Sequence, residues 1–345
     1  MSVALGLLII ALAMVLIFDF TNGFHDASNM VATLIASRAM SPAQALLLVG
    51  VFTFLGPLIA GTAVADTIGG FVSLQDLSPT LGVVLVLCGI TAAVAWNLLT
   101  WRLAMPSSSS HALVGGLVGA VLISAGPDKV VWGLTQLEQG EITGVTKVLL
   151  ALLLSPIAGL IFGFALHRMM CFLLQGARPS INRHLRHAQW LTAGILAFSH
   201  GTNDAQKGMG IITLMLLLSG AIQEFIVPTW VILSSASCIT LGTMLGGWRI
   251  VKTVGYGIYK LRPLHGLDAQ LTSSAVIFGA SLVGGPVSTT HVVSSAIMGI
   301  GASERPKAVH WMKAREIALT WVVTLPGSAL LGVLLTWPIL LIFEF

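Results

Sequence analysis

Charged residues and cysteines are both scarce in this sequence. Only 9% of its 345 residues are Asp, Glu, Lys or Arg, whereas 56% are hydrophobic, and soluble domains carry about 25% charged residues. This composition excludes an ordinary soluble domain and indicates a membrane protein. The three cysteines, Cys88, Cys171 and Cys238, share no spacing, which fits neither a disulfide framework nor a zinc site.

Nucleotide-binding loops are also missing. The sequence contains neither a Walker A motif nor a Rossmann glycine fingerprint, so ATP-driven transport would need another chain. We expect no organic cofactor, no enzymatic activity and no nucleic acid partner. The formal charge of +4 is less informative than the position of the charges, because Lys and Arg concentrate in the cytoplasmic loops of membrane proteins.

Long apolar runs are abundant instead. Alternating strands of about ten residues, typical of an outer-membrane barrel, are absent. The first run has no Lys or Arg before it and no cleavage site after it, so we interpret it as a helix and not as a signal peptide. We predict an all-α polytopic membrane protein with about ten helical segments embedded in lipid. Runs long enough to cross the ~30 Å hydrocarbon core lie at 2–18, 44–65, 80–101, 147–166, 226–248 and 314–343, and shorter or interrupted ones at 107–125, 189–219, 270–285 and 287–302.

The sequence contains an internal repeat. The signature at residues 20–29 aligns with residues 198–207 at an offset of 178, and the hydroxyl run "PSSSSH" (106–111) aligns with "PVSTTH" (286–291) at an offset of 180. Two motifs in the same order at nearly the same offset indicate a duplication. We therefore divide the chain into a first repeat at 1–166, a basic loop at 167–188 and a second repeat at 189–345.

The distribution of Lys and Arg predicts that the repeats are inverted. The basic loop has four arginines and no acid, which places it in the cytoplasm. Counting crossings from it puts both termini outside, so the first hydroxyl run is entered from outside and the second from inside. We expect two inverted repeats of about five helical segments each, with broken helices or re-entrant hairpins near the midplane, as in secondary transporters.

Asp26 and Asp204 occupy matched positions in the two signatures. A carboxylate at membrane depth costs at least ~2.5 kcal/mol and therefore faces a partner or a water-filled cavity. An interfacial acid is the alternative for Asp26, but recurrence beside amides and imidazoles favours a cation or proton site. Oxygen ligands suit Na⁺, whereas neighbouring histidines suit a proton relay. The expected coupling residues are Asp26, Asp204, Asn22, His25, Asn29, His200 and Asn203.

The two hydroxyl runs predict an oxyanion site. Pro106 and Pro286 are suited to the first position of a helix, and the positive end of each following helix, together with the hydroxyls, would bind an anion. Ordinary Ser/Thr capping between close-packed helices is the alternative. His111 and His291 are either proton carriers or hydrogen-bonded helix residues. The expected anion ligands in the runs are Ser107, Ser108, Ser109, Ser110, Ser288, Thr289 and Thr290.

Lys207 distinguishes the second repeat from the first, since it takes the place of Asn29. A buried ammonium there would pair with Asp26 or Asp204 or neutralise a bound anion, whereas snorkelling to the interface is the alternative. We assign Lys207 and its neighbour Gln206 to the anion site.

The stretches "NGFHDASN", "PSSSSH", "FSHGTNDAQKG" and "PVSTTH" resemble the inorganic phosphate transporter (PiT) family over essentially the whole chain. The resemblance implies a carrier in the cell inner membrane that moves inorganic phosphate with a cation, commonly as a homodimer. It also implies that the hydroxyl runs hold phosphate and that Asp26, Asn29, Asn203 and Asp204 hold the coupling cation or orient the site.

Two departures from the sodium-coupled pattern concern the coupling ion. His25 precedes the first acid, and Lys207 replaces the last amide of the second signature. These departures look like the low-affinity bacterial carriers, for which the resemblance implies proton symport, sometimes of phosphate with a divalent metal ion, rather than Na⁺ symport.

Three other functions are consistent with parts of this pattern. Hydroxyls and helix ends would also serve a carrier of another oxyanion such as sulfate. An intramembrane hydrolase would use one Ser with His111 or His291, but a duplicated site is unusual for catalysis with a single nucleophile. A passive channel is the third alternative.

Overall fold

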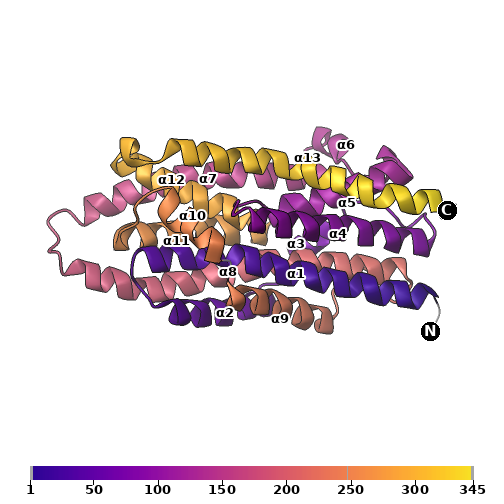
Figure 1. Cartoon of the computed structure of the whole chain (residues 1–345), viewed down its shortest axis with the longest axis horizontal. Coiled ribbons are helices and arrows are strands. Elements are labelled where there is room, and N and C mark those ends of the chain that lie inside the picture. Colours follow the sequence, from indigo (N-terminus) through magenta and orange to yellow (C-terminus); the bar gives the residue numbers. More distant parts are fainter. Residues whose placement is uncertain (1–2, 247, 343–345) are drawn as a thin grey trace.

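The computed structural model describes residues 3–246 and 248–342, and in these ranges the chain is helical with a single isolated β-bridge. The helices lie side by side along the long axis of the molecule (Figure 1). Five of them are long and apolar enough to cross a membrane. The predicted all-α polytopic membrane fold is confirmed.

The two halves of the chain contain the same series of helices. The first half comprises α1 (Val3–Ala36), α2 (Pro42–Ile59), α3 (Ala63–Gly69), α4 (Pro79–Arg102), α5 (Ser109–Ala125), the short α6 (Leu134–Glu138) and α7 (Gly144–Leu173). The second half comprises α8 (Ile181–Leu218), α9 (Thr229–Leu245), α10 (Trp248–Gly257), α11 (Pro263–Leu282), α12 (Thr289–Glu304) and α13 (Trp311–Ile342). α8 therefore repeats α1, α11 and α12 repeat α4 and α5, and α13 repeats α7.

The repeats are inverted and intertwined. α1 and α13 have their outer ends at one end of the bundle, which we call the terminal end, and residues 174–180 lie at the opposite end, the central-loop end (Figure 1). The α4–α5 hairpin enters from the terminal end and the α11–α12 hairpin from the central-loop end (Figure 1). α1 packs on α9 and α8 on α2, while α5 packs on α13 and α12 on α7, so each contact occurs twice.

The glycine of each signature allows the closest of these helix crossings. A Cβ on Gly23 would lie 2.0 Å from the carbonyl oxygen of Ile239 in α9, and a Cβ on Gly201 would lie 2.1 Å from that of Thr53 in α2. No side chain fits at either crossing, because real Cβ atoms do not approach an oxygen so closely. Small residues of this kind let membrane helices come into contact along their backbones.

Several boundaries predicted from hydropathy are wrong. The first helix does not end at residue 18 but continues to Ala36, and α7 and α8 extend into the predicted loop at 167–188 and leave only residues 174–180 between them. The run at 44–65 divides into α2 and the separate α3. The physical reason is that a helix continues through polar residues wherever they have partners in the protein or in water, whereas hydropathy detects only the lipid-compatible part.

Candidate functional site

The two hydroxyl runs form the tips of the two hairpins, and these tips meet inside the bundle. Ser110 Oγ of the first tip donates to the carbonyl oxygen of Val287 in the second tip at 2.9 Å. The rings of His111 and His291, which directly follow the two runs in the first turns of α5 and α12, have centroids 4.8 Å apart. All the predicted hydroxyl residues in both tips are buried. The inverted hairpins therefore bring residues about 180 positions apart into one site.

Each tip is fixed by the cap of the helix that follows it. Ser108 Oγ accepts from the backbone N–H of His111 at 3.2 Å, and Ser288 Oγ accepts from that of His291 at 3.4 Å. The prediction that Pro106 and Pro286 occupy the first helical positions is wrong, because these serines are the N-caps and the prolines lie two residues earlier. The first turns of α5 and α12 still present N–H groups that have no partner within their own helix.

Asp26 lies on α1 at the centre of a dense hydrogen-bond network. Its Oδ2 accepts from Thr289 Oγ1 at 2.8 Å, and its Oδ1 accepts from Thr290 Oγ1 at 2.9 Å and from Asn29 Nδ2 at 3.2 Å. His25 Nδ1 lies 3.1 Å from Oδ1. The first signature and the second hydroxyl run therefore form one unit, and the alternative of an interfacial acid is wrong because the Asp26 side chain is buried.

Asp204 is the matched acid on α8, and its partner is a cation. Lys207 Nζ donates to Asp204 Oδ1 and, at 2.9 Å, to the carbonyl oxygen of Val287. Lys207 is fully buried, so it does not snorkel to an interface. Its ammonium therefore contacts one of the two carboxylate oxygens of Asp204 directly.

The two acids are linked through one hydroxyl. Thr289 Oγ1 lies 2.8 Å from Asp26 Oδ2 and 3.4 Å from Asp204 Oδ2, and His200 Nδ1 lies 3.2 Å from the same Asp204 oxygen. Asp26, His200 and Asp204 each offer an atom within 4.8 Å of the others. The oxygens suit Na⁺, but a second cation would stand beside the Lys207 ammonium and be repelled by it.

A hydrogen-bonded chain leads from the first hairpin to Asp26. Thr100 Oγ1 and Ser107 Oγ are 2.7 Å apart, and Ser107 Oγ lies 3.3 Å from His25 Nε2. The other ring nitrogen of His25 faces Asp26. Because every member can donate or accept a proton, this chain is chemically suited to deliver a proton to the carboxylate.

Asn203 and Gln206 attach α8 to the elements around the site. Asn203 Nδ2 donates to Ser281 Oγ at 2.8 Å and to the Gly285 carbonyl at 3.0 Å, and its Oδ1 accepts from the Val287 N–H at 3.1 Å. Gln206 Oε1 accepts from two backbone N–H groups at the start of α3, at 2.7 and 3.3 Å. Asn203 therefore holds the second hairpin tip against α8, and Gln206 holds α3 against α8. Their predicted roles, Asn203 at the coupling cation and Gln206 at phosphate, remain predictions.

Other predicted residues are buried in the same region without recorded side-chain bonds. Ser109 Oγ and both amide atoms of Asn22 have no hydrogen-bond partner in the described part of the chain. The ring of His291 stacks on Trp321 of α13 with centroids 4.1 Å apart. Unpartnered buried polar groups carry a free-energy cost, so Ser109 and Asn22 are available to a ligand or to water.

Asp19 is another buried carboxylate close to the site, and no prediction from the sequence included it. It is fully buried, and neither of its oxygens has a hydrogen-bond partner among the described residues. A Cβ on Gly208 would lie 2.1 Å from its Oδ1, so the carboxylate lies against α8 next to Lys207. The signal that would have found it is spacing: Asp19 precedes Asp26 by seven residues, two turns along the same helix face.

Comparison with known proteins identifies the family of this chain. Residues 22–178 and again residues 174–332 match the family described as the phosphate transporter family. The chain belongs to this family. The two matches correspond to the two structural repeats and confirm the duplication inferred from the sequence.

Relatives within the phosphate transporter family are similar over nearly their whole length. The chain is 41% identical to a probable low-affinity inorganic phosphate transporter of Bacillus subtilis (strain 168). The alignment covers 99% of this chain and 100% of that relative. The chain is also 38% identical to a protein of the same description from Rhizobium meliloti (strain 1021), with 96% of each chain covered. These relatives are transporters, not enzymes.

A solved structure shares the fold of this family member. It is described as the sodium-dependent phosphate transporter and gives a TM-score of 0.80, covering 98% of this chain and 100% of that chain at 23% sequence identity. The similarity extends through both repeats and both hairpins. The inverted architecture is therefore a property of the phosphate transporter fold.

Proposed function

We propose that this protein imports inorganic phosphate by proton symport and that Asp26 is the proton acceptor. The observation that carries the proposal is that Thr289 and Thr290 both donate their hydroxyl hydrogens to Asp26. Each hydroxyl has one hydrogen, so while Asp26 is ionised these threonines have none to offer an anion. Protonation of Asp26 removes its charge and converts one of its oxygens into a donor, so at least one of the two threonines becomes free to donate to phosphate.

The proposed phosphate position lies between the hairpin tips. The first turns of α5 and α12 direct N–H groups and positive dipole ends toward this region, and the Lys207 ammonium, paired with Asp204, lies at the Val287 carbonyl of the second tip. Backbone N–H groups, hydroxyls and an ammonium together suit a tetrahedral anion. The proposed phosphate ligands are Ser107, Ser108, Ser109, Ser110, Ser288, Thr289, Thr290, Gln206 and Lys207.

Lys207 is the reason for preferring H⁺ to Na⁺ as the coupling ion. Its ammonium already neutralises Asp204, so this carboxylate needs no metal cation. Asp26 has no ammonium partner, and the chain through His25 and Ser107 can supply it with a proton. The name of the solved structural neighbour makes Na⁺ the specific alternative.

The proposal includes an orientation. The terminal end faces outward and the central-loop end faces the cytoplasm, because residues 167–188 contain four arginines and no acid. Uptake would then begin at the terminal end, with the protein in the cytoplasmic membrane. The family resemblance implies two further parts of this proposal. Phosphate would cross together with a divalent metal ion, and the protein would form a homodimer.

Competition by sulfate tests the substrate. Phosphate carries O–H groups near neutral pH and sulfate does not, so a site that contains ionisable acceptors such as Asp26 and Asp204 favours phosphate. We expect a tenfold excess of sulfate to leave the uptake of labelled phosphate into proteoliposomes unchanged, with unlabelled phosphate as the matched competitor. Equal inhibition by sulfate and phosphate would instead indicate a general oxyanion carrier.

A further inference from the structure

Two cavities lie against the two hairpin tips. The first has a volume of about 510 Å³ and is lined by α3, the start of α7 and the tip of the α11–α12 hairpin. The second has a volume of about 410 Å³ and is lined by the tip of the α4–α5 hairpin and the first half of α13. Since α13 repeats α7 and the hairpins repeat each other, the two cavities are formed by equivalent elements of the inverted repeats.

Each cavity contains one lysine near the start of its long helix. Lys147 of α7 lines the first cavity and Lys313 of α13 lines the second. The carbonyl oxygen of Leu160 in α7 lies against Gly299, and that of Ala329 in α13 lies against the matching Gly119. Lys147 precedes Leu160 by 13 residues and Lys313 precedes Ala329 by 16. The difference of three residues is just under one helical turn, so the two lysines lie on similar faces of their helices.

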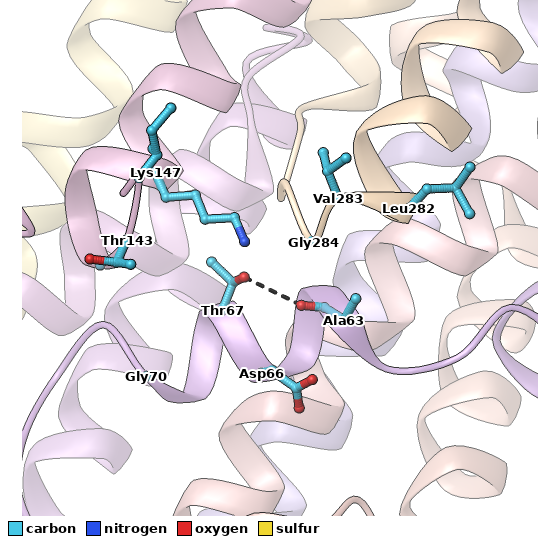
Figure 2. Close-up of a pocket in the computed structure, with 11 residues that line it drawn as sticks. Ala63, Asp66, Thr67, Gly70, Thr143, Lys147, Leu282, Val283 and Gly284 are labelled. Carbon is cyan, nitrogen blue, oxygen red and sulfur yellow. Dashed lines mark hydrogen bonds between the residues drawn. The ribbon is translucent and has the colours of Figure 1, made fainter. Parts of the chain in front are cut away.

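The Lys147 ammonium points at the hairpin tip. Figure 2 shows its side chain extending between Thr143 and Gly284 toward Thr67, whereas the carboxylate of Asp66 points away from it. Lys147 Nζ and Thr67 Oγ1 each lie 3.1 Å from the point that a Cβ on Gly284 would occupy. Within the described residues no carboxylate lies within 4.0 Å of this ammonium. Asp66 of the same cavity interacts electrostatically with Lys147 but forms no ion pair with it within 4.0 Å, so the ammonium charge is available to an anion entering the cavity.

Lys313 has an acidic neighbour that leaves it similarly available. Its Nζ lies 2.6 Å from Glu316 Oε2, and the two side chains are 41% and 61% exposed. Exposed ion pairs of this kind are weak, because water and salt screen them. A passing anion can therefore replace Glu316 at the ammonium with little cost.

Both cavities adjoin the proposed phosphate position. In the first, Gly284 is followed by Gly285, whose carbonyl accepts from Asn203, and α3 is bonded to Gln206. In the second, Pro106 is followed by Ser107, which is linked to His25. One hairpin tip therefore separates each cavity from the site.

We infer that these cavities are the two ends of the phosphate path, and that Lys147 at the outer end and Lys313 at the inner end are the first positive charges that phosphate contacts from each side. This inference rests on the proposed function. Positive charges in a recessed mouth attract anions and raise their rate of association. Inverted repeats would supply one such mouth to each side of the membrane.

Transport measured from each side tests the inference. We would compare Lys147→Gln and Lys313→Gln in right-side-out and inside-out vesicles, with initial rates of labelled phosphate entry as the readout. The matched controls are Lys129→Gln for the outer end and Lys307→Gln for the inner end, since neither lysine lines either of these two cavities. Each rate series would be repeated at low and high KCl, because exposed charges act less at high ionic strength.

We expect Lys147→Gln to raise the KM for phosphate about two- to fivefold in right-side-out vesicles only, and Lys313→Gln to do so in inside-out vesicles only. Both effects should shrink at high KCl. Unchanged KM values in both variants, or an effect of both variants on the same side, would overturn the inference. The proposed function would still stand in that case, provided that the wild-type protein transports phosphate. If the wild-type protein moved no phosphate, the proposed function and the inference would both be wrong.

Discussion

Replacing Lys207 by methionine is expected to lower the free energy of unfolding by about 3–5 kcal/mol, because the change leaves the buried Asp204 carboxylate without its partner. Methionine keeps most of the apolar stem and removes the ammonium that donates to Asp204 and to the Val287 carbonyl. Thermal unfolding of the purified protein in detergent measures the effect. A buried unpaired charge is among the costliest defects that one substitution can create.

The double variant Lys207→Met with Asp204→Asn shows whether the loss of stability comes from the unpaired Asp204 carboxylate or from lost packing around Lys207. Removing both charges eliminates the unpaired carboxylate, so we expect the double variant to recover most of the stability lost in Lys207→Met. If Lys207→Met were as stable as the wild-type protein, or if the double variant were no more stable than the single one, Lys207 would not be the counterion of Asp204.

Asp26→Asn is expected to abolish proton-driven accumulation of phosphate while preserving phosphate exchange. Asparagine is neutral at every pH, so it resembles protonated Asp26 and leaves at least one of the two threonine hydroxyls free to donate to phosphate. In the wild-type protein one unit of imposed pH difference supplies about 1.4 kcal/mol, or about tenfold accumulation, for each proton carried with phosphate. In the variant this factor should fall to about one, whereas exchange of labelled for unlabelled phosphate continues and becomes independent of pH.

Asp19→Asn provides the decisive comparison, since Asp19 is a buried carboxylate on the same helix. If Asp26 accepts the coupled proton, Asp19→Asn should still accumulate phosphate in response to a pH difference. Loss of accumulation in Asp19→Asn together with normal coupling in Asp26→Asn would assign the proton to Asp19. Loss of exchange in Asp26→Asn would mean that its carboxylate is needed for binding rather than for coupling.

The duplication was the most informative feature of the sequence. Because Asp26 and Asp204 recur with the two hydroxyl runs at nearly one offset, the duplication followed from the pattern and, with the distribution of Lys and Arg, so did the inverted fold. The structure joins Asp26 to Thr289 and Ser110 to Val287, so these segments do form one site. The family resemblance, rather than the repeat alone, implied this proximity.

The details that depend on packing did not follow from the sequence. Hydropathy ended the first helix at residue 18, which placed Asp19 at a helix end, where an acid is ordinary. The structure continues α1 to Ala36 and buries Asp19 against Gly208. The pairing of Lys207 with Asp204 rather than Asp26 was likewise open, because both acids were candidates until the helices were placed in space.

The two cavities illustrate the same limit. Lys147 and Lys313 lie in segments that resemble ordinary basic helix ends in the sequence. Their correspondence depends on the matching contacts of α7 with α12 and of α13 with α5, and on the hairpin tip beside each lysine. The three-dimensional repeat therefore identifies residues that linear alignment does not.

Phosphate uptake under one imposed gradient at a time tests the account most directly. Wild-type protein in liposomes would be given either an inward proton gradient without Na⁺ or an inward Na⁺ gradient at equal pH, with labelled phosphate outside. Because the Lys207 ammonium already pairs with Asp204 and would repel a second cation, and because we propose that Asp26 accepts the coupled proton, we predict accumulation with the proton gradient and none with the Na⁺ gradient. Accumulation driven by Na⁺ alone would contradict the central claim.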